Sequence, residues 1–527
     1  MTMRAGSLAG LLLCWLALLL LSLLLRPLLP VDENRYIGVA WEMWQRGDFL
    51  VPWLNGEPYS HKPPLFFWLI HAGWWLFGVN EWWPRSVAAL VSLAVLPAVS
   101  YLAGLLWPQD RAMRRLVPWI LFGFIFWAAF YSWLQIDMLM VLFTVVAMVG
   151  VVRASQGHPA GWLVTGLAIG LGVLSKGPVV LLHVLPAALL APFWIDAQAR
   201  PSWWSWYAGV LASVVSGAAI ALAWALPAAS AGGEAYAQAI LWGQTADRVV
   251  NSFAHAQPWW WYLPWLPLLA APWILLPWLW RDLFSWPRET GTRFCLTWLL
   301  TVLVLASAIS GKQAKYLLPV LPAIALLVAH TVTYRQQTAV TQRPWLPALF
   351  MLLAGVALAV LPQRLETAPW LAGISPVWGM LLAVPALALL LLRNPGTSAC
   401  IHRLVYLSVA AVAIVQLALF PAAGPAYDLR QAGQVIARTQ SDGRAVANIG
   451  KYHGQFHFPG RLRQRLVPLR REDAYGWSVG HPDGLLVAYY DGPAPVHPDV
   501  LHAQAYRGGG LAIWPGHTVV DAPEVLP

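Results

Sequence analysis

The feature that most restricts the fold of this chain is a series of apolar runs, each about as long as a membrane-crossing helix, that recurs along most of its length. About 20 consecutive apolar residues suffice to cross a bilayer as an α-helix. Only 11% of the 527 residues are charged, whereas a soluble domain carries about 25%. The chain therefore has too few charges to coat a soluble protein, and we predict an α-helical polytopic membrane protein.

About thirteen of these runs are expected to be transmembrane helices. The first run resembles a signal peptide, but it lacks a small-residue cleavage site before Arg26, so we expect it to be retained as a helix. The run at 64–78 is short and follows Lys62 closely, so we assign it to the first loop. The thirteen expected helices are 8–30, 84–106, 116–133, 138–152, 161–175, 178–195, 204–228, 258–280, 294–310, 313–333, 345–362, 373–392 and 404–421.

Basic residues fall mainly in alternate gaps between these runs, which is the positive-inside pattern of membrane proteins. With a cytoplasmic N-terminus, the first loop and the C-terminal tail lie outside the cytoplasm. This topology requires the runs 161–175 and 178–195 to be two helices, because a single helix would invert all later orientations. The arginines of the predicted cytoplasmic gaps are Arg111, Arg114, Arg115, Arg153, Arg200, Arg281, Arg288, Arg293, Arg335, Arg343, Arg393 and Arg403.

The composition shifts beyond about residue 422, where the apolar runs end. The segment GPAYDLRQAGQVIARTQSDGRAVANIG predicts a short amphipathic helix and then a strand. GLLVAYYDG and LAIWPG are typical of further strands. We therefore divide the chain into a transmembrane catalytic domain, 1–421, and a small soluble α/β domain, 422–527, on the non-cytoplasmic side.

The first loop, residues 31–69, is longer, more aromatic and richer in ionisable groups than a linker between two helices needs to be. It opens with Asp32 and Glu33 and ends near His61 and Lys62. Between them lie a short amphipathic segment and a turn at Arg46-Gly47-Asp48. We interpret this loop as the floor of an active site on a membrane surface.

Three acids are candidates for catalysis. Asp32 and Glu33 directly follow a membrane helix, where a carboxylate can take a proton from an acceptor hydroxyl, hold a metal, or simply be a solvated helix end. Asp137 lies between apolar residues in WLQIDMLM. A carboxylate there is costly unless it is paired or faces a watery cavity, so function is the default hypothesis.

Several cations lie on the predicted outer side, where positive-inside statistics disfavour them. They could converge on a lipid phosphate, since Lys and Arg recognise phosphate by charge and hydrogen bonds. Alternatively, each could reach individually toward the lipid headgroups. The cations are Lys62, Lys176, Arg248, Lys312 and Lys315.

His61 and His255 are candidate metal ligands with acids nearby, although hydrogen-bonded histidines without a metal fit equally. The three cysteines show neither metal spacing nor a disulfide framework. The sequence contains neither a nucleotide fingerprint nor a nucleophile elbow. A net charge of +10 would suggest nucleic acid in a soluble protein, but here the charges follow the topology. We expect no nucleotide, no nucleic acid, and a lipid-linked activated substrate.

Several motifs together carry a family resemblance. The runs DENRY, GDFLVPWLNGEPYSHKPPLFFWL and FGVNEWWPRSVAAL resemble the first-loop pattern of glycosyltransferases that use polyprenyl-phosphate sugars. These include the bacterial lipid A aminoarabinose transferases and, more distantly, the protein O-mannosyltransferases. QIDMLM, LSKGP, QTADRVVNSFAHAQPWWWYLPWLP and SGKQAKYLLPVLPAIALL follow in family order, so the resemblance covers roughly residues 10 to 420.

The resemblance implies a GT-C fold and inverting sugar transfer from a polyprenyl phosphate on the periplasmic face of the bacterial inner membrane. Asp32 then matches the family's essential acid, as base or acceptor-orienting group, and Asp137 matches its second acid. His255 matches a histidine linked to a metal, zinc, in the aminoarabinose branch, which usually has glutamate where this chain has His61. Histidine can still bind zinc, but one negative charge is lost. The residues that match the donor-phosphate groups are Lys62, Arg248 and Tyr316.

These expectations combine into one mechanism. The donor phosphodiester lies among Lys62, Arg248, Lys312 or Lys315, and Tyr316, which stabilise the departing phosphate. Asp32, with Asp137, orients and deprotonates the acceptor hydroxyl. We expect lipid A to be the acceptor, with transfer to protein as an alternative. We also expect the enzyme to be a monomer. A lipid or sugar transporter also fits many helices and buried charges, but the chain lacks the paired halves typical of transporters.

Overall fold

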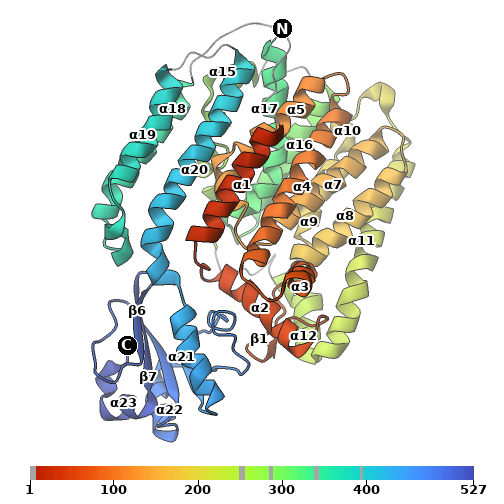
Figure 1. The fold of residues 1–527 in the computed structure, drawn as a ribbon. Coiled ribbons are helices and arrows are strands. Elements are labelled where there is room, and N and C mark those ends of the chain that lie inside the picture. Colours follow the sequence, from red (N-terminus) through yellow and green to blue (C-terminus); the bar gives the residue numbers. More distant parts are fainter. Residues whose placement is uncertain (1–7, 248–255, 284–288, 337–343, 392–395) are drawn as a thin grey trace.

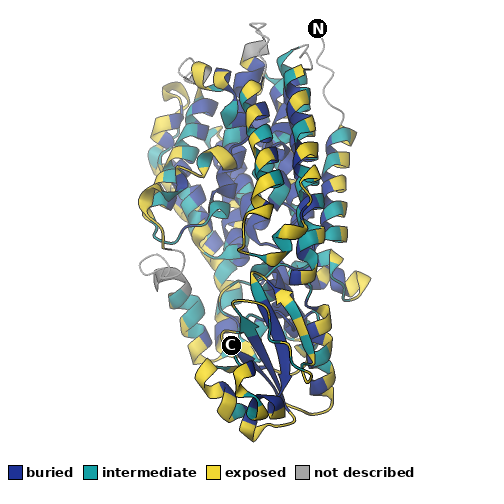
Figure 2. Cartoon of the chain, turned by 90° about the vertical axis from the view of Figure 1, so that its left-hand side faces the viewer, coloured by how far each residue is buried: buried dark blue, intermediate teal, exposed yellow. Residues whose placement is uncertain are grey.

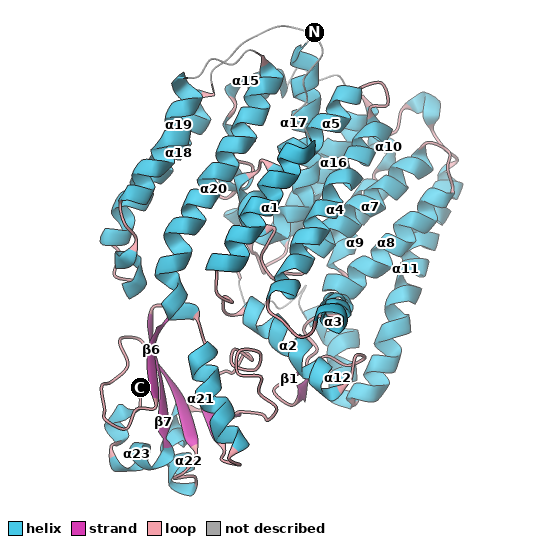
Figure 3. Ribbon diagram, in the orientation of Figure 1, coloured by secondary structure: helices cyan, strands magenta, loops and turns pink. Residues whose placement is uncertain are grey.

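The computed structural model describes residues 8–247, 256–283, 289–336, 344–391 and 396–527. A large helical bundle carries a small sheet-containing domain at one end (Figure 1; Figure 3). Exposed residues follow the outward faces of the peripheral helices, and buried residues fill the interior of the bundle (Figure 2). This arrangement confirms the predicted class, an α-helical polytopic protein with a C-terminal α/β domain.

All thirteen expected runs contain helix in the described part of the chain. Eight helical segments there are long and apolar enough to cross a membrane. They are built on α1 (Leu8–Leu25), α4 (Trp82–Leu106), α7 (Asp137–Ser155), α11 (Trp203–Gly232), α16 (Thr290–Ala308), α17 (Leu321–Gln336), α18 (Trp345–Val360) and α20 (Thr397–Tyr427). Three expected runs form the shorter apolar helices α8 (Ala160–Lys176), α9 (Val179–Leu189) and α19 (Val377–Leu391).

The two remaining runs are not continuous helices, and the expectation of a single straight span is wrong for both. The run 116–133 is divided between α5 (Arg111–Phe122) and α6 (Ile125–Phe130). The run 258–280 contains only short helical turns, which include α14 (Leu266–Leu269) and the beginning of α15 (Pro277–Leu283). Five prolines in 258–280 explain this, because each proline removes a backbone donor and clashes with the preceding helical turn.

Helices α8 and α9 are separate, as the predicted topology requires. Gly177, with a φ of +89°, ends α8, and Pro178 precedes α9. Helix α8 packs closely along α7, where a Cβ atom on Gly161 would lie 2.3 Å from the carbonyl oxygen of Gly150. This close packing brings Asp137 at the start of α7 and Lys176 at the end of α8 to the same end of the bundle.

The first loop folds over that end of the bundle (Figure 1). It contains α2 (Asp32–Arg46), the hairpin β1 (Trp53–Leu54) and β2 (Glu57–Pro58), and α3 (Leu65–Phe77). Gly47, with a φ of +67°, terminates α2 at the predicted turn. Apolar residues of α2, including Ile37 and Met43, are fully buried. The loop is therefore a packed layer that fixes the position of Asp32.

The C-terminal domain has a five-stranded sheet in the order β4-β3-β5-β7-β6. Strand β3 is parallel to β4 and β5, whereas β7 is antiparallel to β5 and β6. Helix α20 continues past residue 421 to Tyr427 before this domain begins. The domain consists of α21 (Arg430–Ser441), β3 (Val446–Ile449), β4 (Val467–Leu469), α22 (Ala474–Gly480), β5 (Leu485–Tyr490), β6 (His502–Tyr506), β7 (Gly509–Pro515) and α23 (Gly516–Asp521).

The C-terminal domain binds directly to the first loop. Trp41 Nε1 donates a hydrogen bond of 2.9 Å to the carbonyl oxygen of Leu462. The side-chain amide of Asn55 exchanges two hydrogen bonds, of 2.9 and 2.8 Å, with the backbone of Leu466. The rings of Trp74 and Phe458 stack with centroids 5.6 Å apart. The first loop is thus held between the bundle and the C-terminal domain, on the same side of the membrane.

The close contact of α7 with α8 gives a test of the fold. We expect Gly161→Ala to destabilise the protein by about 1–3 kcal/mol, because the new methyl group meets backbone rather than a movable side chain. Thermal unfolding in detergent measures the change. Gly424→Ala is the matched control, since a Cβ atom there meets nothing within 4 Å. Equal melting temperatures for the two variants would contradict the packing.

Candidate active site

Asp32 is the centre of a charged network that joins three parts of the chain. Lys315 Nζ lies 2.7 Å from Asp32 Oδ2. Gln135 bridges the pair: its amide nitrogen is 3.3 Å from Asp32 Oδ2, and its amide oxygen accepts from Lys315 at 3.3 Å. Arg35, one helical turn along α2, pairs with the other carboxylate oxygen. Asp32 is therefore fixed by groups from the first loop, the segment before α7 and the segment before α17.

The pKa of the Asp32 carboxyl reflects this network. Burial by itself raises the pKa, but the Lys315 ammonium, assisted by Arg35 and Gln135, outweighs it and lowers the pKa to about 2. The carboxylate is therefore ionised at physiological pH. Its contribution to stability is present above the ordinary pKa of 3.8 and is lost as pH falls toward 2. In this state Asp32 is a weak base, because effective general bases have a pKa near the working pH.

A second ion pair lies beside the first. Asp137 at the start of α7 pairs with Lys176 at the end of α8. Lys176 Nζ also lies 4.7 Å from the centroid of the Tyr316 ring. Asp137 is 2% exposed, and within the described structure its Oδ2 has no hydrogen-bond partner. Lys315 belongs to the first pair, and the adjacent Tyr316 contacts Lys176 of the second pair, so the two pairs form one cluster.

Lys62 also belongs to this region, since its charge acts on Asp137 together with those of Lys176 and Lys315. Lys62 follows His61, which is exposed and has its ring centroid 5.3 Å from that of Tyr59. The structure thus brings Asp32, Asp137, Lys62, Lys315 and Tyr316 to one end of the bundle. Arg248 and His255 lie outside the described residues.

Glu33 was expected to act together with Asp32, but the structure separates their roles. Its side chain is 1% exposed and pairs with the equally buried Arg26. Its two oxygens also accept hydrogen bonds from the backbone nitrogens of Leu29, at 2.9 Å, and Leu134, at 2.7 Å. Consecutive helical residues point about 100° apart, so Glu33 turns into the bundle. It fixes the start of α2 and presents no open oxygen to a substrate.

Lys312 also differs from its expected place among the phosphate-binding cations. Its ammonium donates a hydrogen bond of 2.9 Å to the carbonyl oxygen of Gln257 and another to the carbonyl oxygen of Ile309. The residue is 3% exposed. Lys312 therefore caps backbone carbonyls at the end of α16, and Lys315 is the lysine of this segment that reaches the acids.

A metal site is not formed by the described residues, among which no group of three or more His, Cys, Asp or Glu side chains is placed to hold an ion. His61 is not part of such a group there, and His255 is outside the described residues. The zinc expectation therefore stays a prediction, and no chemical step below depends on it.

Known proteins resemble this chain in sequence and in fold. Residues 61–228 match the family model of dolichyl-phosphate-mannose-protein mannosyltransferases. An undecaprenyl phosphate-alpha-4-amino-4-deoxy-L-arabinose arabinosyl transferase of Pseudomonas savastanoi is 33% identical over 59% of this chain and 60% of its own length. The Enterobacter sp. transferase of the same name is 30% identical over 70% and 66%. The chain thus spans a little under two thirds of the curated relatives it matches.

The fold comparison extends over the whole chain. The structure of ArnT from Cupriavidus metallidurans bound to undecaprenyl phosphate aligns with a TM-score of 0.74, covering 96% of each chain at 18% identity. The chain therefore resembles the aminoarabinose transferases and the protein mannosyltransferase model in sequence. Its multi-pass helical bundle has the GT-C fold of the aligned structure.

Two members of the network, Arg35 and Gln135, were not predicted from the sequence. Arg35 is three residues after Asp32, so helical spacing places both on one face of α2. Gln135 precedes Asp137 by two residues in the QIDMLM motif. Both signals were available, but neither residue type is diagnostic by itself, and only the fold shows that Gln135 faces Asp32.

The different surroundings of Asp32 and Glu33 can be tested by neutralising each acid. We expect Glu33→Gln to destabilise the protein by about 3–5 kcal/mol, because it leaves the buried Arg26 without its counter-charge. Asp32 is 25% exposed, so Asp32→Asn should change stability by about 1 kcal/mol or less. Thermal unfolding of both variants in one detergent measures the difference. Similar losses would refute the assignment of Glu33 to the framework.

Proposed function

We propose that this chain is an inverting glycosyltransferase of the bacterial inner membrane, with its active site on the periplasmic face. It moves a sugar from a polyprenyl phosphate to lipid A, and the polyprenyl phosphate that we propose is undecaprenyl phosphate. The names of the curated relatives support this donor and reaction. The observation that carries the proposal is the joined Asp32–Lys315 and Asp137–Lys176 pairs, which lie under the first loop at one end of the bundle.

The donor phosphate is proposed to lie against the cationic side of this cluster. Lys62, Lys315 and Tyr316 come from segments that meet at the cluster, and Arg248 completes the set predicted from sequence. Negative charge grows on the phosphate as the sugar departs, and fixed cations in a partly buried site stabilise that charge most strongly. The polyprenyl tail extends into the lipid alongside the bundle.

Lys315 links donor binding to the strength of Asp32 as a base. In the free protein its ammonium holds the pKa of Asp32 near 2 against the effect of burial. A bound phosphate attracts the same ammonium and weakens its interaction with Asp32. The pKa of the buried carboxyl then rises, and Asp32 becomes a better acceptor of a proton when the donor is present.

Asp137 is proposed to orient the acceptor. One of its oxygens is bound by Lys176, while Oδ2 is free of protein partners in the described structure. A buried carboxylate oxygen without a partner is costly, so a hydroxyl or amine of a substrate would satisfy it. The arrangement therefore supports two acids with different tasks: Asp32 for the proton and Asp137 for position.

Neutralising Asp32 tests this function. We expect Asp32→Asn to lower transfer by about 10²–10⁴-fold, the usual effect of removing a general base, while the protein stays folded. Purified protein is incubated with radiolabelled undecaprenyl-phosphate sugar and lipid A, and labelled lipid A is counted. Glu57→Gln is the control, since Glu57 is an exposed acid of the same loop outside the cluster. Near-normal transfer by Asp32→Asn would overturn the assignment.

The same preparation separates the alternatives. Transfer to a peptide instead of lipid A would assign the chain to protein glycosylation. Movement of labelled donor into vesicles without any transfer product would indicate a transporter. The charges gather at one end of the bundle and not at its middle, which disfavours transport because transporter sites lie near the bilayer midplane.

A further inference from the structure

A cavity of about 650 Å³ lies between the C-terminal domain and the start of the first loop. Pro30 and Val31, the residues directly before Asp32, form part of its wall. Thr367, between α18 and α19, forms another part. The remaining wall comes from the ends of β3, β5, β6 and β7. The cavity therefore lies beside the residues that directly precede the candidate catalytic acid.

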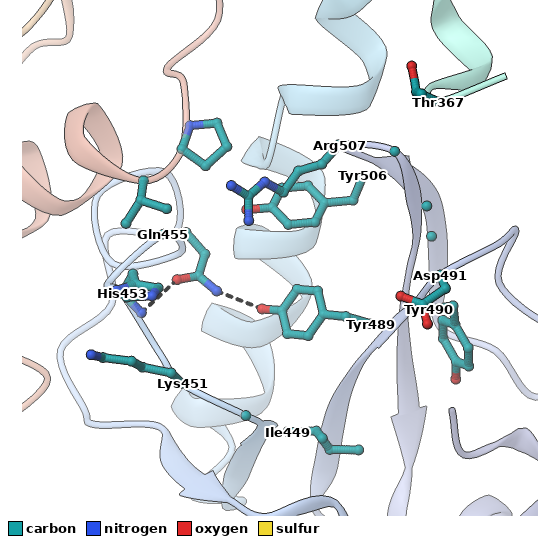
Figure 4. Close-up of a pocket in the computed structure, with 16 residues that line it drawn as sticks. Thr367, Ile449, Lys451, His453, Gln455, Tyr489, Tyr490, Asp491, Tyr506 and Arg507 are labelled. Carbon is teal, nitrogen blue, oxygen red and sulfur yellow. Dashed lines mark hydrogen bonds between the residues drawn. The ribbon is translucent and has the colours of Figure 1, made fainter. Parts of the chain in front are cut away.

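Cationic side chains line this cavity. Lys451 and Arg507 are exposed at its mouth, and His453 is half-buried within it. In the close-up, Arg507, His453, Gln455 and Tyr489 surround a common space (Figure 4). Asp491 is the acid among the lining residues, so two permanent cations and a histidine face one carboxylate. The charge of the cavity favours an anion.

His453 connects this cavity to the catalytic cluster. The pKa of its imidazole is lowered, first by burial and then by the charges of Arg35, Lys451 and Arg507, while Asp32 acts in the opposite direction. Arg35 is itself paired with Asp32. Pro30 and Val31, which line the cavity, directly precede Asp32, so a ligand in the cavity would lie close to the candidate site.

The backbone at Arg507 is held in an unusual conformation. Arg507 and Gly508 form the two-residue turn between β6 and β7, and Arg507 has a φ of +59°. Such turns favour Asn, Asp or Gly at this position, and other residues are strained there. A Cβ atom on Gly508 would lie 2.5 Å from the carbonyl oxygen of Thr367. The turn is thus pressed against the bundle with an arginine at its tip.

The floor of the cavity is a fixed polar network. Gln455, which is 5% exposed, donates a hydrogen bond of 2.6 Å to the Tyr489 hydroxyl. That hydroxyl donates a hydrogen bond of 2.8 Å to Asn448 Oδ1. The amide oxygen of Gln455 accepts from the backbone nitrogen of His453 at 3.0 Å. These bonds hold His453 and Tyr489 in place before any ligand arrives. Pre-formed pockets of about 300–1,000 Å³ with a few fixed polar groups are typical ligand sites.

We propose that this cavity binds a phosphate group of the acceptor glycolipid and so holds the acceptor's reacting end at Asp32. Arg507 and Lys451 contact the phosphate by charge and hydrogen bonds, and His453 contributes a hydrogen bond from the wall. The inference rests on the proposed transferase function and assigns acceptor selection to the C-terminal domain. The donor and the acceptor then enter from opposite sides of α2.

Removing the two permanent cations tests the cavity. We expect the double variant Lys451→Gln with Arg507→Asn, in nanodiscs, to raise KM for bisphosphorylated lipid A about tenfold or more, the effect of losing charge-assisted hydrogen bonds. KM for the undecaprenyl-phosphate sugar should stay unchanged. Asn suits the turn better than Arg, so the variant should fold. Arg463→Gln is the matched control, because Arg463 is an exposed cation of the same domain outside the cavity.

Two further measurements separate this proposal from the transferase proposal. Lipid A stripped of its phosphates should bind equally weakly to wild type and double variant, and inorganic phosphate should compete with intact lipid A only in the wild type. Binding is measured without donor by native mass spectrometry, so it does not require transfer. An unchanged KM and unchanged binding in the double variant would overturn the cavity assignment. If the double variant loses lipid A binding but the wild type shows no transfer, the transferase function would be overturned instead.

Discussion

The candidate site depends on the pairing of acids and lysines at a membrane boundary, above all that of Asp32 with Lys315. A charge in such a place is costly unless it has a partner and hydrogen bonds. Lys315 lies 283 residues from Asp32 in sequence, and Gln135 bridges them. Asp137 and Lys176 form the neighbouring pair. These pairs form only where α2, α7, α8 and the segment before α17 meet, so the packing of the bundle also assembles the candidate site.

The first loop has a double role that follows from its two faces. Glu33 and the apolar residues of α2 attach it to the bundle, while Trp41 and Asn55 attach it to the C-terminal domain. Asp32 is at the edge where these layers meet. A catalytic acid on an unsupported loop would lose the geometry that transfer requires, since misplacement by about 1 Å can cost two orders of magnitude in rate. The C-terminal domain therefore forms a third layer around the candidate site.

The sequence predicted the helical class and the small α/β domain, because these depend on local hydrophobicity, turn residues and charge. It also pointed to Asp32 and Asp137, which the structure places in one cluster and whose catalytic roles stay predictions. It did not predict the direction of individual side chains. Glu33 and Lys312 carry the expected charges but point into structural networks. The run 258–280 has the composition of a span, yet its prolines prevent a continuous helix. Such outcomes depend on tertiary contacts between segments far apart in sequence, which no local pattern reports.

A lysine shared between a base and a phosphate would give the proposed reaction an order. While Lys315 pairs with Asp32, its ammonium lowers the pKa of the carboxyl to about 2, so Asp32 is a weak base. We infer that a donor phosphate competes for the ammonium and strengthens the same carboxylate as a base, so that activation of the acceptor follows donor binding. Under this proposal Lys315 contacts the donor and Asp32 contacts the acceptor, and their ion pair lies between the two substrates.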